Sequence, residues 1–163
     1  MSLSIVRYPD PRLTQPSAPV EVFDRDLQDF ADALYQTMLK APGVGITAAH
    51  VGRLLRLVII DLPELGGRQD YVNPEILSVS SDTMDHVEGS VSMPGMTESL
   101  TRPAEVLIRY QTLDGVSHET SLKGFPAICM QHEIDQLNGI FWIDRLSRLK
   151  RERLLKKWRK VQS

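Results

Sequence analysis

Residues 128–139 contain side chains that can bind a metal, with a histidine followed directly by a glutamate, His132-Glu133. The apolar residues of this stretch recur at helical spacing, and Asn138-Gly139 is typical of a helix end. If Gln136 were a histidine, the stretch would contain H-E-x-x-H, in which two imidazoles on one helix face bind a metal and the glutamate polarises the metal-bound water. Because the second imidazole is an amide here, three alternatives remain: a working metal centre, a rebuilt one or a vacated one.

Helices are expected on both sides of this stretch. An acidic cap, Asp24 or Asp26, precedes a helix that is expected to run to about Lys40. Its apolar stripe consists of Leu27, Phe30, Leu34 and Met38. A last helix is expected over residues 147–161, with its first serine as N-cap. Four prolines within residues 4–22 predict an extended or turning N-terminal segment.

Strands are expected in the middle of the chain. Residues 54–61 are short, β-branched and apolar, which predicts a buried strand. Residues 71–73 and 75–80 predict two short strands broken at a proline, and residues 105–121 predict a hairpin with an Asp-Gly turn. Residues 140–143 predict one more short strand. This order favours an α+β fold with the motif-bearing helix among the strands.

Two stretches have no regular pattern of their own. Residues 43–50 are small and close-packed, which allows a ligand or another strand to approach the backbone. Residues 88–95 are rich in turn-forming residues.

Residues 43–50, 88–92 and 131–136 resemble, in order and spacing, the three signature motifs of the peptide deformylases: G-φ-G-φ-A-A-x-Q, E-G-C-φ-S and Q-H-E-x-D-H. The similarity covers essentially the whole chain. It implies a single deformylase-like domain over residues 1–163, with mixed or antiparallel strands around a central motif-bearing helix and a basic C-terminal helix at residues 147–163.

The resemblance also implies a metallohydrolase, with Fe(II) or Zn(II), that removes the formyl group from the N-terminal methionine of nascent chains. On this chain, His132 is the one metal ligand of the family that is retained, and Glu133 corresponds to the general acid/base. In the family, a glutamine and the backbone N–H at the position of Val91 stabilise the oxyanion. His50 replaces that glutamine here, and two roles are open for it: a donor to the oxyanion or a purely packing residue. The nascent peptide is expected to bind as an added strand with its methionine in an apolar pocket. The corresponding residues are Gly43, Val44, Gly45, Phe125, Ile128 and Cys129.

The chain departs from the family at two metal ligands, because Ser90 replaces the cysteine and Gln136 replaces the second histidine. A serine hydroxyl stays neutral near pH 7, and an amide oxygen is a weak ligand for Fe(II) or Zn(II). Structural zinc sites contribute ~10–16 kcal/mol, and most of a comparable affinity is lost with two of three ligands. The sequence therefore predicts that the metal position of the family is empty or very weakly occupied, that no metal cofactor is to be expected, and that the catalytic site is degenerate.

A rebuilt metal site is one alternative, and it could recruit His50, His86 or Cys129. Cys129 lies three residues before His132, on the same helix face. The simpler interpretations are a small buried residue for Cys129 and a position at the rim of the methionine pocket for His86.

A metal-free hydrolase is a second alternative. Two ligands of one tetrahedral metal lie ~3.5 Å apart, so Ser90 could approach His132, with Glu133 nearby, as in a Ser-His-acid hydrolase. We expect instead that Ser90, His132 and Gln136 form an uncharged hydrogen-bond network in the vacated space. The family also implies that Glu88 pairs with Arg102, and that Asp135 is a polar support of the helix.

The charge distribution is uneven. Residues 147–163 carry a net charge of +7, while the rest of the chain carries −9, which predicts an anionic docking partner for the last helix. The resemblance implies that this partner is the ribosome. The single cysteine, the lack of a signal-peptide pattern and the lack of ~18 consecutive apolar residues favour a cytoplasmic protein without membrane segments.

Overall fold

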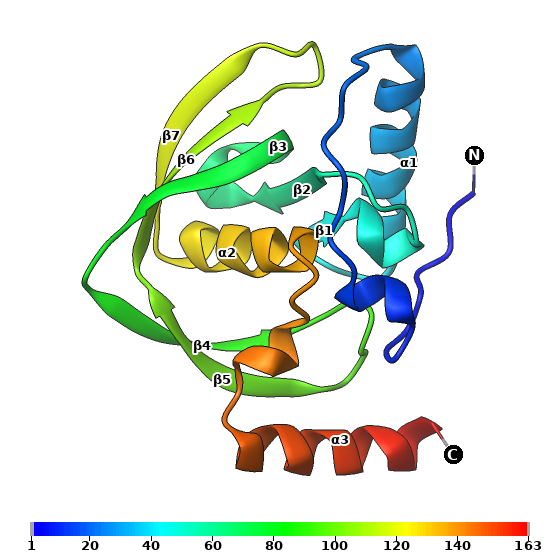
Figure 1. Ribbon diagram of the computed structural model, residues 1–163, viewed down its shortest axis with the longest axis vertical. Helices are drawn as coiled ribbons and strands as arrows, with labels where there is room; N and C mark the ends of the chain where they lie inside the picture. Colours follow the sequence, from blue (N-terminus) through cyan, green and yellow to red (C-terminus); the bar gives the residue numbers. More distant parts are fainter. Residues whose placement is uncertain (1, 163) are drawn as a thin grey trace.

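The computed structural model describes residues 2–162, which form two antiparallel sheets and three α-helices (Figure 1). The five-stranded sheet has the order β1 (Gly45–Thr47), β2 (Leu57–Leu62), β3 (Gly67–Val79), β6 (Glu105–Gln111) and β7 (Ser117–Lys123). The two-stranded sheet pairs β4 (Thr83–Gly89) with β5 (Thr97–Pro103). The helices are α1 (Arg25–Lys40), α2 (Phe125–Leu137) and α3 (Arg148–Gln162). The expected α+β class and the antiparallel strands are confirmed.

The helix α1 forms as its sequence predicts. The Asp24 side chain accepts a hydrogen bond of 3.0 Å from the backbone N–H of Leu27, so that one of the unpaired donors of the first turn is satisfied. The predicted apolar stripe is buried and packs against β1 and β2.

The helix α2 lies between the two sheets, and Figure 1 shows it crossing the centre of the molecule. It begins after Gly124, whose φ of 65° suits glycine, and Pro126 occupies its first turn. Its apolar residues Ala127, Met130, Ile134 and Leu137 pack with the core of the large sheet. The motif residues of this helix are therefore held by a helix buried on several sides.

Residues 71–79 belong to one continuous strand, β3, and not to two short strands. Asn73 adopts a φ of 51°, and its side chain bonds to both the N–H and the C=O of Val20 and to Gln111. The register between β3 and β6 shifts after Val72. This irregularity accommodates Pro74 without ending the strand.

The hairpin of β4 and β5 and the segment around residue 142 differ from the expectations. The two strands are largely polar and were not predicted, although they pair regularly from Thr83↔Pro103 to Gly89↔Thr97. Residues 140–143 do not form a strand, because Trp142–Arg145 is a 3-10 helix (η4). Phe141 and Ile143 are buried beside α3, so the apolar run there reflects burial and not strand pairing.

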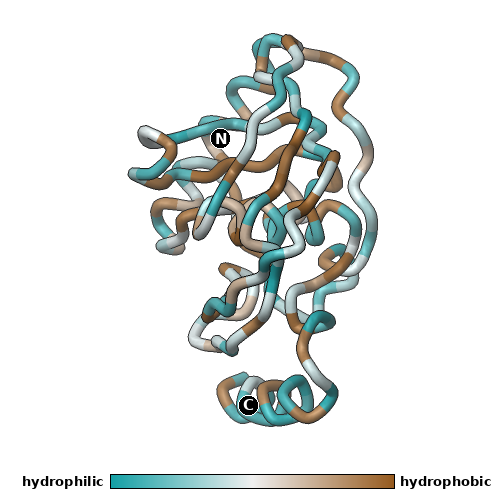
Figure 2. The backbone as a smooth tube through the Cα atoms, turned by 90° about the vertical axis from the view of Figure 1, so that its left-hand side faces the viewer, coloured by the Kyte–Doolittle hydropathy of each residue, from teal (hydrophilic) through white to brown (hydrophobic). Residues whose placement is uncertain are grey.

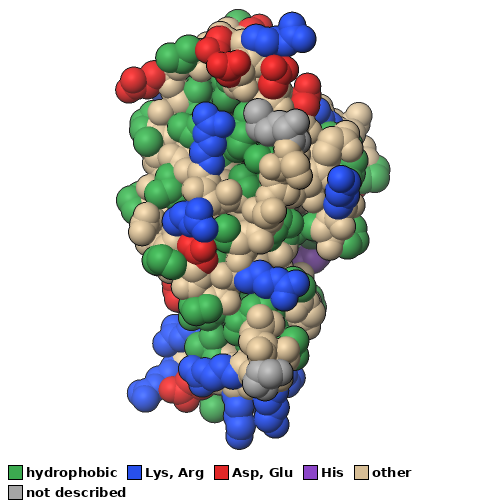
Figure 3. Space-filling view, turned by 90° about the vertical axis from the view of Figure 1, so that its right-hand side faces the viewer, with side chains coloured by type: hydrophobic (Ala, Val, Ile, Leu, Met, Phe, Trp, Pro, Cys, Tyr) green, Lys and Arg blue, Asp and Glu red, His purple; other side chains and the backbone are tan. Residues whose placement is uncertain are grey.

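The helix α3 lies at one end of the molecule, where Figure 2 shows hydrophobic and hydrophilic residues alternating along it. Ser147 accepts a hydrogen bond of 3.3 Å from Lys150 N–H, as expected for its cap. Leu154 and Trp158 are buried, and the Trp158 indole donates to the backbone oxygen of Tyr8. On the face in Figure 3, Lys and Arg side chains gather at this end and acidic side chains at the other. Among residues 2–162, every helix falls short of the length and apolarity that crossing a bilayer requires.

Candidate functional site

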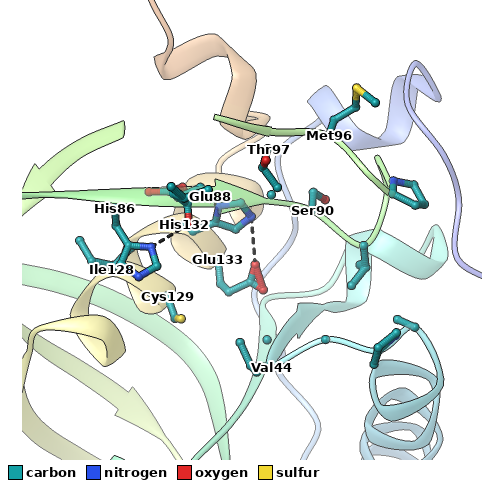
Figure 4. Close-up of a pocket in the computed structure, with 18 of the residues that line it drawn as sticks. Val44, His86, Glu88, Ser90, Met96, Thr97, Ile128, Cys129, His132 and Glu133 are labelled. Atoms are coloured by element: carbon teal, nitrogen blue, oxygen red, sulfur yellow. Dashed lines mark hydrogen bonds and ion pairs between the residues drawn. The ribbon is translucent and has the colours of Figure 1, made fainter. Parts of the chain in front are cut away.

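A cavity of about 510 Å³ opens between α2, the end of β4 and the edge strand β1 (Figure 4). It brings together residues from all three motif-like stretches, although these lie far apart in the sequence. Of the residues singled out from the sequence, the following line this cavity: Gly43, Val44, Gly45, His50, His86, Glu88, Ser90, Val91, Phe125, Ile128, Cys129, His132 and Glu133.

The imidazole of His132 is oriented by Glu88. His132 Nδ1 lies 2.9 Å from Glu88 Oε1, and Arg102 donates two hydrogen bonds, of 2.5 and 2.9 Å, to the same carboxylate. Burial acts to raise the pKa of Glu88, but the hydrogen bonds from His132 and Arg102 lower it to about 2. An ionised carboxylate only accepts hydrogen bonds, so Nδ1 carries the proton and Nε2 of the neutral ring is an acceptor.

This orientation is supported by a buried charge network. Arg102 is almost fully buried and also donates to Asp135 at 2.9 Å. Asp135 in turn accepts two hydrogen bonds from Arg145, which is half exposed. The expected pairing of Glu88 with Arg102 and the supporting role of Asp135 are confirmed.

His50 presents a hydrogen-bond donor to the cavity. Its Nδ1 accepts a hydrogen bond of 3.0 Å from the backbone N–H of Thr47, so the proton of the neutral ring is on Nε2. Burial, and then the proximity of His132, lower the pKa of His50 to about 3, which keeps the ring neutral. His50 Nε2 is buried and has no partner within residues 2–162.

Glu133 presents a buried carboxyl group next to His132. Its Oε1 lies 3.7 Å from His132 Nε2, and its Oε2 has no hydrogen-bond partner in the described part of the chain (Figure 4). Burial raises the pKa of Glu133 to about 7. A Cβ at Gly45 would lie 3.4 Å from Glu133 Oε2, at ordinary van der Waals contact, so the backbone of β1 passes beside the carboxyl group.

Gln136 does not line the cavity. Its side-chain Nε2 donates a hydrogen bond of 2.7 Å to the backbone oxygen of Leu13, in the N-terminal 3-10 helix η1 (Pro11–Thr14). Ser90 Oγ accepts a hydrogen bond of 3.1 Å from Ser92 N–H. The expectation of a network joining Ser90, His132 and Gln136 was wrong, because their hydrogen bonds in residues 2–162 go to other groups.

This donor set does not fit the metal that the deformylase resemblance implies. His132 Nε2 is an available ligand atom, but the amide nitrogen of Gln136 is bonded to Leu13, and Ser90 offers a neutral hydroxyl. Within residues 2–162, no three His, Cys, Asp or Glu side chains lie close enough together to hold a metal ion.

The walls of the cavity are mostly apolar. The His86 ring lies 4.7 Å from the Phe125 ring at the rim, as expected for His86. Burial, followed by the effect of Glu133, raises the pKa of the Cys129 thiol to about 12, so it remains a neutral, weakly polar group. A Cβ at Gly43 would lie 2.9 Å from Val91 Cγ1, which explains the small residue there.

Several wall residues were not predicted from the sequence: Ala41, Pro42, Val87, Gly89, Pro94, Gly95, Met96 and Thr97. The sequence gives little indication that these residues line a cavity, because they only flank or lie within the motif-like stretches and carry no reactive groups.

Comparisons of the sequence with known proteins identify the family of the chain. Residues 2–152 match the family model for polypeptide deformylase. A "peptide deformylase-like" protein of Agrobacterium fabrum is 54% identical over 159 residues, covering 98% of this chain and 96% of the relative. A peptide deformylase of Afipia carboxidovorans is 43% identical over 160 residues, covering 96% and 94% of the two chains.

A solved structure extends the agreement to the fold. The peptide deformylase of Ehrlichia chaffeensis in complex with actinonin is 34% identical to this chain, with a TM-score of 0.92 and 98% of each chain covered. The family match, the sequence identity and the shared fold all cover nearly the whole chain. We conclude that the chain belongs to the polypeptide deformylase family.

Proposed function

We propose that this protein binds the N-terminal end of an extended peptide in the cavity and does not carry out metal-dependent deformylation. The observation that carries this proposal is the direction of the Gln136 side chain, which bonds to Leu13 O and leaves the cavity. The cavity that would hold a peptide is still present, with a volume of about 510 Å³. These two facts support a peptide site in which two of the three metal ligands of the family are replaced.

The edges of two strands favour binding of the peptide as an added strand. In the described sheets β1 pairs only with β2, and β4 pairs only with β5, so each has one edge open for backbone hydrogen bonds. Both strands border the cavity. Val44, which is 43% exposed beside β1, offers apolar surface to a ligand side chain.

The binding and the loss of catalysis are tested together. After anaerobic purification with added iron, we expect well below one metal ion per chain by elemental analysis and no turnover of formyl-Met-Ala-Ser. Calorimetry is expected to show saturable binding of a Met-Ala-Ser peptide, with or without the formyl group. Stoichiometric metal with turnover contradicts the loss of catalysis, and the absence of any binding contradicts the peptide site.

A matched pair of variants locates the peptide. Val44→Lys replaces apolar surface at the edge of the cavity with a charge that a bound peptide would partly desolvate, and it is expected to weaken binding about tenfold. Val116→Lys makes the same change at a site that is 50% exposed and outside the cavity lining, and is expected to leave the affinity unchanged.

A metal-free hydrolase is a second candidate, and the hydrogen bond between Glu88 and His132 favours it. This acid–imidazole pair leaves His132 Nε2 as a potential general base, as in Ser-His-acid hydrolases. The position of Ser90 does not support the nucleophile role, because its hydroxyl is hydrogen-bonded to Ser92 N–H and not to His132. We therefore expect a fluorophosphonate probe to leave the protein unlabelled, whereas labelling that Ser90→Ala abolishes would establish the hydrolase.

We propose the ribosome as the partner of α3. This helix buries Leu154 and Trp158 and directs most of its basic residues outward (Figure 3). Ribosomal RNA supplies the dense negative charge that such a surface binds, with strong salt dependence. Co-sedimentation with ribosomes that is present at low ionic strength and lost at high ionic strength is the expected result, and its absence at low ionic strength contradicts this partner.

A further inference from the structure

Glu133 is the carboxyl group of the cavity that lacks a cationic side-chain partner. The other carboxyl group in the lining, Glu88, is neutralised by two hydrogen bonds from Arg102. Within residues 2–162, the one ionisable side chain in contact with the Glu133 carboxyl group is His132. Its Nε2 lies 3.7 Å from Glu133 Oε1, beyond hydrogen-bond distance. Its Oε2 is buried without a partner and faces the space beside Gly45.

The group next to Glu133 is also an acceptor. His132 donates a hydrogen bond from Nδ1–H to Glu88, so Nε2 of the neutral ring directs a lone pair at the cavity. A buried carboxyl oxygen and an imidazole nitrogen that both lack a donor suit a ligand group with several hydrogen-bond donors, and a positive charge on that group favours the ionised form of the carboxyl group. An ammonium group has three donors and one positive charge, and it does not need the fixed geometry of a metal ion.

We propose that the cavity selects the free α-ammonium group of an unformylated peptide N-terminus over a formylated one. This inference rests on the proposed peptide binding and names the end group that the site recognises. The ammonium donates to Glu133 Oε2 and His132 Nε2 and compensates the buried carboxyl group. A formylated terminus has a single neutral N–H, which leaves Glu133 without a counter-charge.

His50 serves both kinds of peptide and does not discriminate between them. Its Nε2–H is a buried donor without a partner among the described residues, and it suits a carbonyl oxygen. A free peptide offers its first peptide carbonyl, and a formylated peptide offers that carbonyl and the formyl oxygen. The preference therefore depends on Glu133 and His132.

The test is calorimetric titration of the metal-stripped full-length protein, near neutral pH, with three peptides: Met-Ala-Ser, formyl-Met-Ala-Ser and acetyl-Met-Ala-Ser. We expect Met-Ala-Ser to bind at least about tenfold more tightly than either acylated peptide, because hydrogen bonds to charged groups are the strong ones. Equal or tighter binding of the formylated peptide overturns this inference and leaves the proposed function standing. If no peptide binds, the proposed function fails, and this inference fails with it.

A pair of glutamate variants assigns the preference to Glu133. Glu133→Gln removes the charge with little change in shape and is expected to reduce the affinity for Met-Ala-Ser about tenfold, with little effect on the formylated peptide. Glu64→Gln makes the same change at an exposed residue outside the lining and is expected to preserve the preference. A preference that survives in a folded Glu133→Gln protein, with a thermal melt like that of the wild type, contradicts the assignment.

Discussion

Replacing Arg102 with methionine is expected to lower the free energy of unfolding by about 3–5 kcal/mol. The Arg102 guanidinium is almost fully buried and neutralises two carboxylates, Glu88 and Asp135. Methionine fills part of the volume of the arginine side chain, but it leaves two buried carboxylates without the hydrogen bonds that Arg102 donates to them. Urea unfolding followed by circular dichroism measures the effect.

Arg109→Met is the control for this prediction. Arg109 also contacts two carboxylates, Glu75 and Glu119, each at 3.3 Å, but its side chain is half exposed. Exposed ion pairs contribute ~0–1 kcal/mol, so we expect a change within that range. Similar losses for the two variants would show that burial does not govern the energetics of the network.

The Arg102 variant is also expected to unfold at higher pH during acid titration. The folded-state pKa of Glu88 is about 2, below the ordinary value of 4.5 for a glutamate, so the contribution of Glu88 to stability is complete above pH 4.5 and is lost as the pH falls toward 2. Removing Arg102 removes two of the hydrogen bonds that lower the pKa of Glu88, so the loss of stability in acid begins at higher pH. An unchanged acid midpoint relative to Arg109→Met contradicts this explanation.

The double variant Ser90→Cys, Gln136→His is expected to bind about one metal ion per chain and to turn over formyl-Met-Ala-Ser. It restores the thiol and the second imidazole of the family beside His132, whose ring is already oriented by Glu88. A bound metal of this kind contributes on the order of 10 kcal/mol, which exceeds the ~1 kcal/mol lost with the hydrogen bond from Gln136 to Leu13 O. Elemental analysis and the visible absorption of a Co(II)-loaded sample measure the result.

The single variants separate the contribution of the thiol to metal binding from that of the second imidazole. Gln136→His alone supplies two imidazoles and is expected to bind metal weakly, while Ser90→Cys alone supplies one thiol and one imidazole. A double variant that folds like the wild type but holds no metal would mean that the cavity differs from a deformylase site by more than its two substituted ligands.

The sequence predicted the elements that depend on local patterns. The acidic cap at Asp24 and the stripe of α1, the Asp-Gly hairpin of β6 and β7 and the serine cap of α3 all follow from periodicity and from hydrogen bonds between near neighbours. The hairpin of β4 and β5 escaped prediction because its residues are largely polar, and its place beside α2 depends on contacts distant in the chain. The apolar run at residues 140–143 was wrongly predicted to be a strand, because a buried 3-10 helix and a buried strand require the same apolar residue types.

The sequence by itself determined which side chains could take part in chemistry here: His132 and Glu133 on one helix, with Ser90 and Gln136 where the family has metal ligands. The tertiary structure decided how these groups are used. A helix places residues 132 and 136 on one face, but Leu13, 123 residues before Gln136, provides the carbonyl that draws the amide out of the cavity. Glu133 likewise has no cationic side chain as a partner among residues 2–162, because Arg102 bonds to Glu88 and Asp135 instead. Such choices between partners depend on three-dimensional distances, which local sequence patterns do not specify.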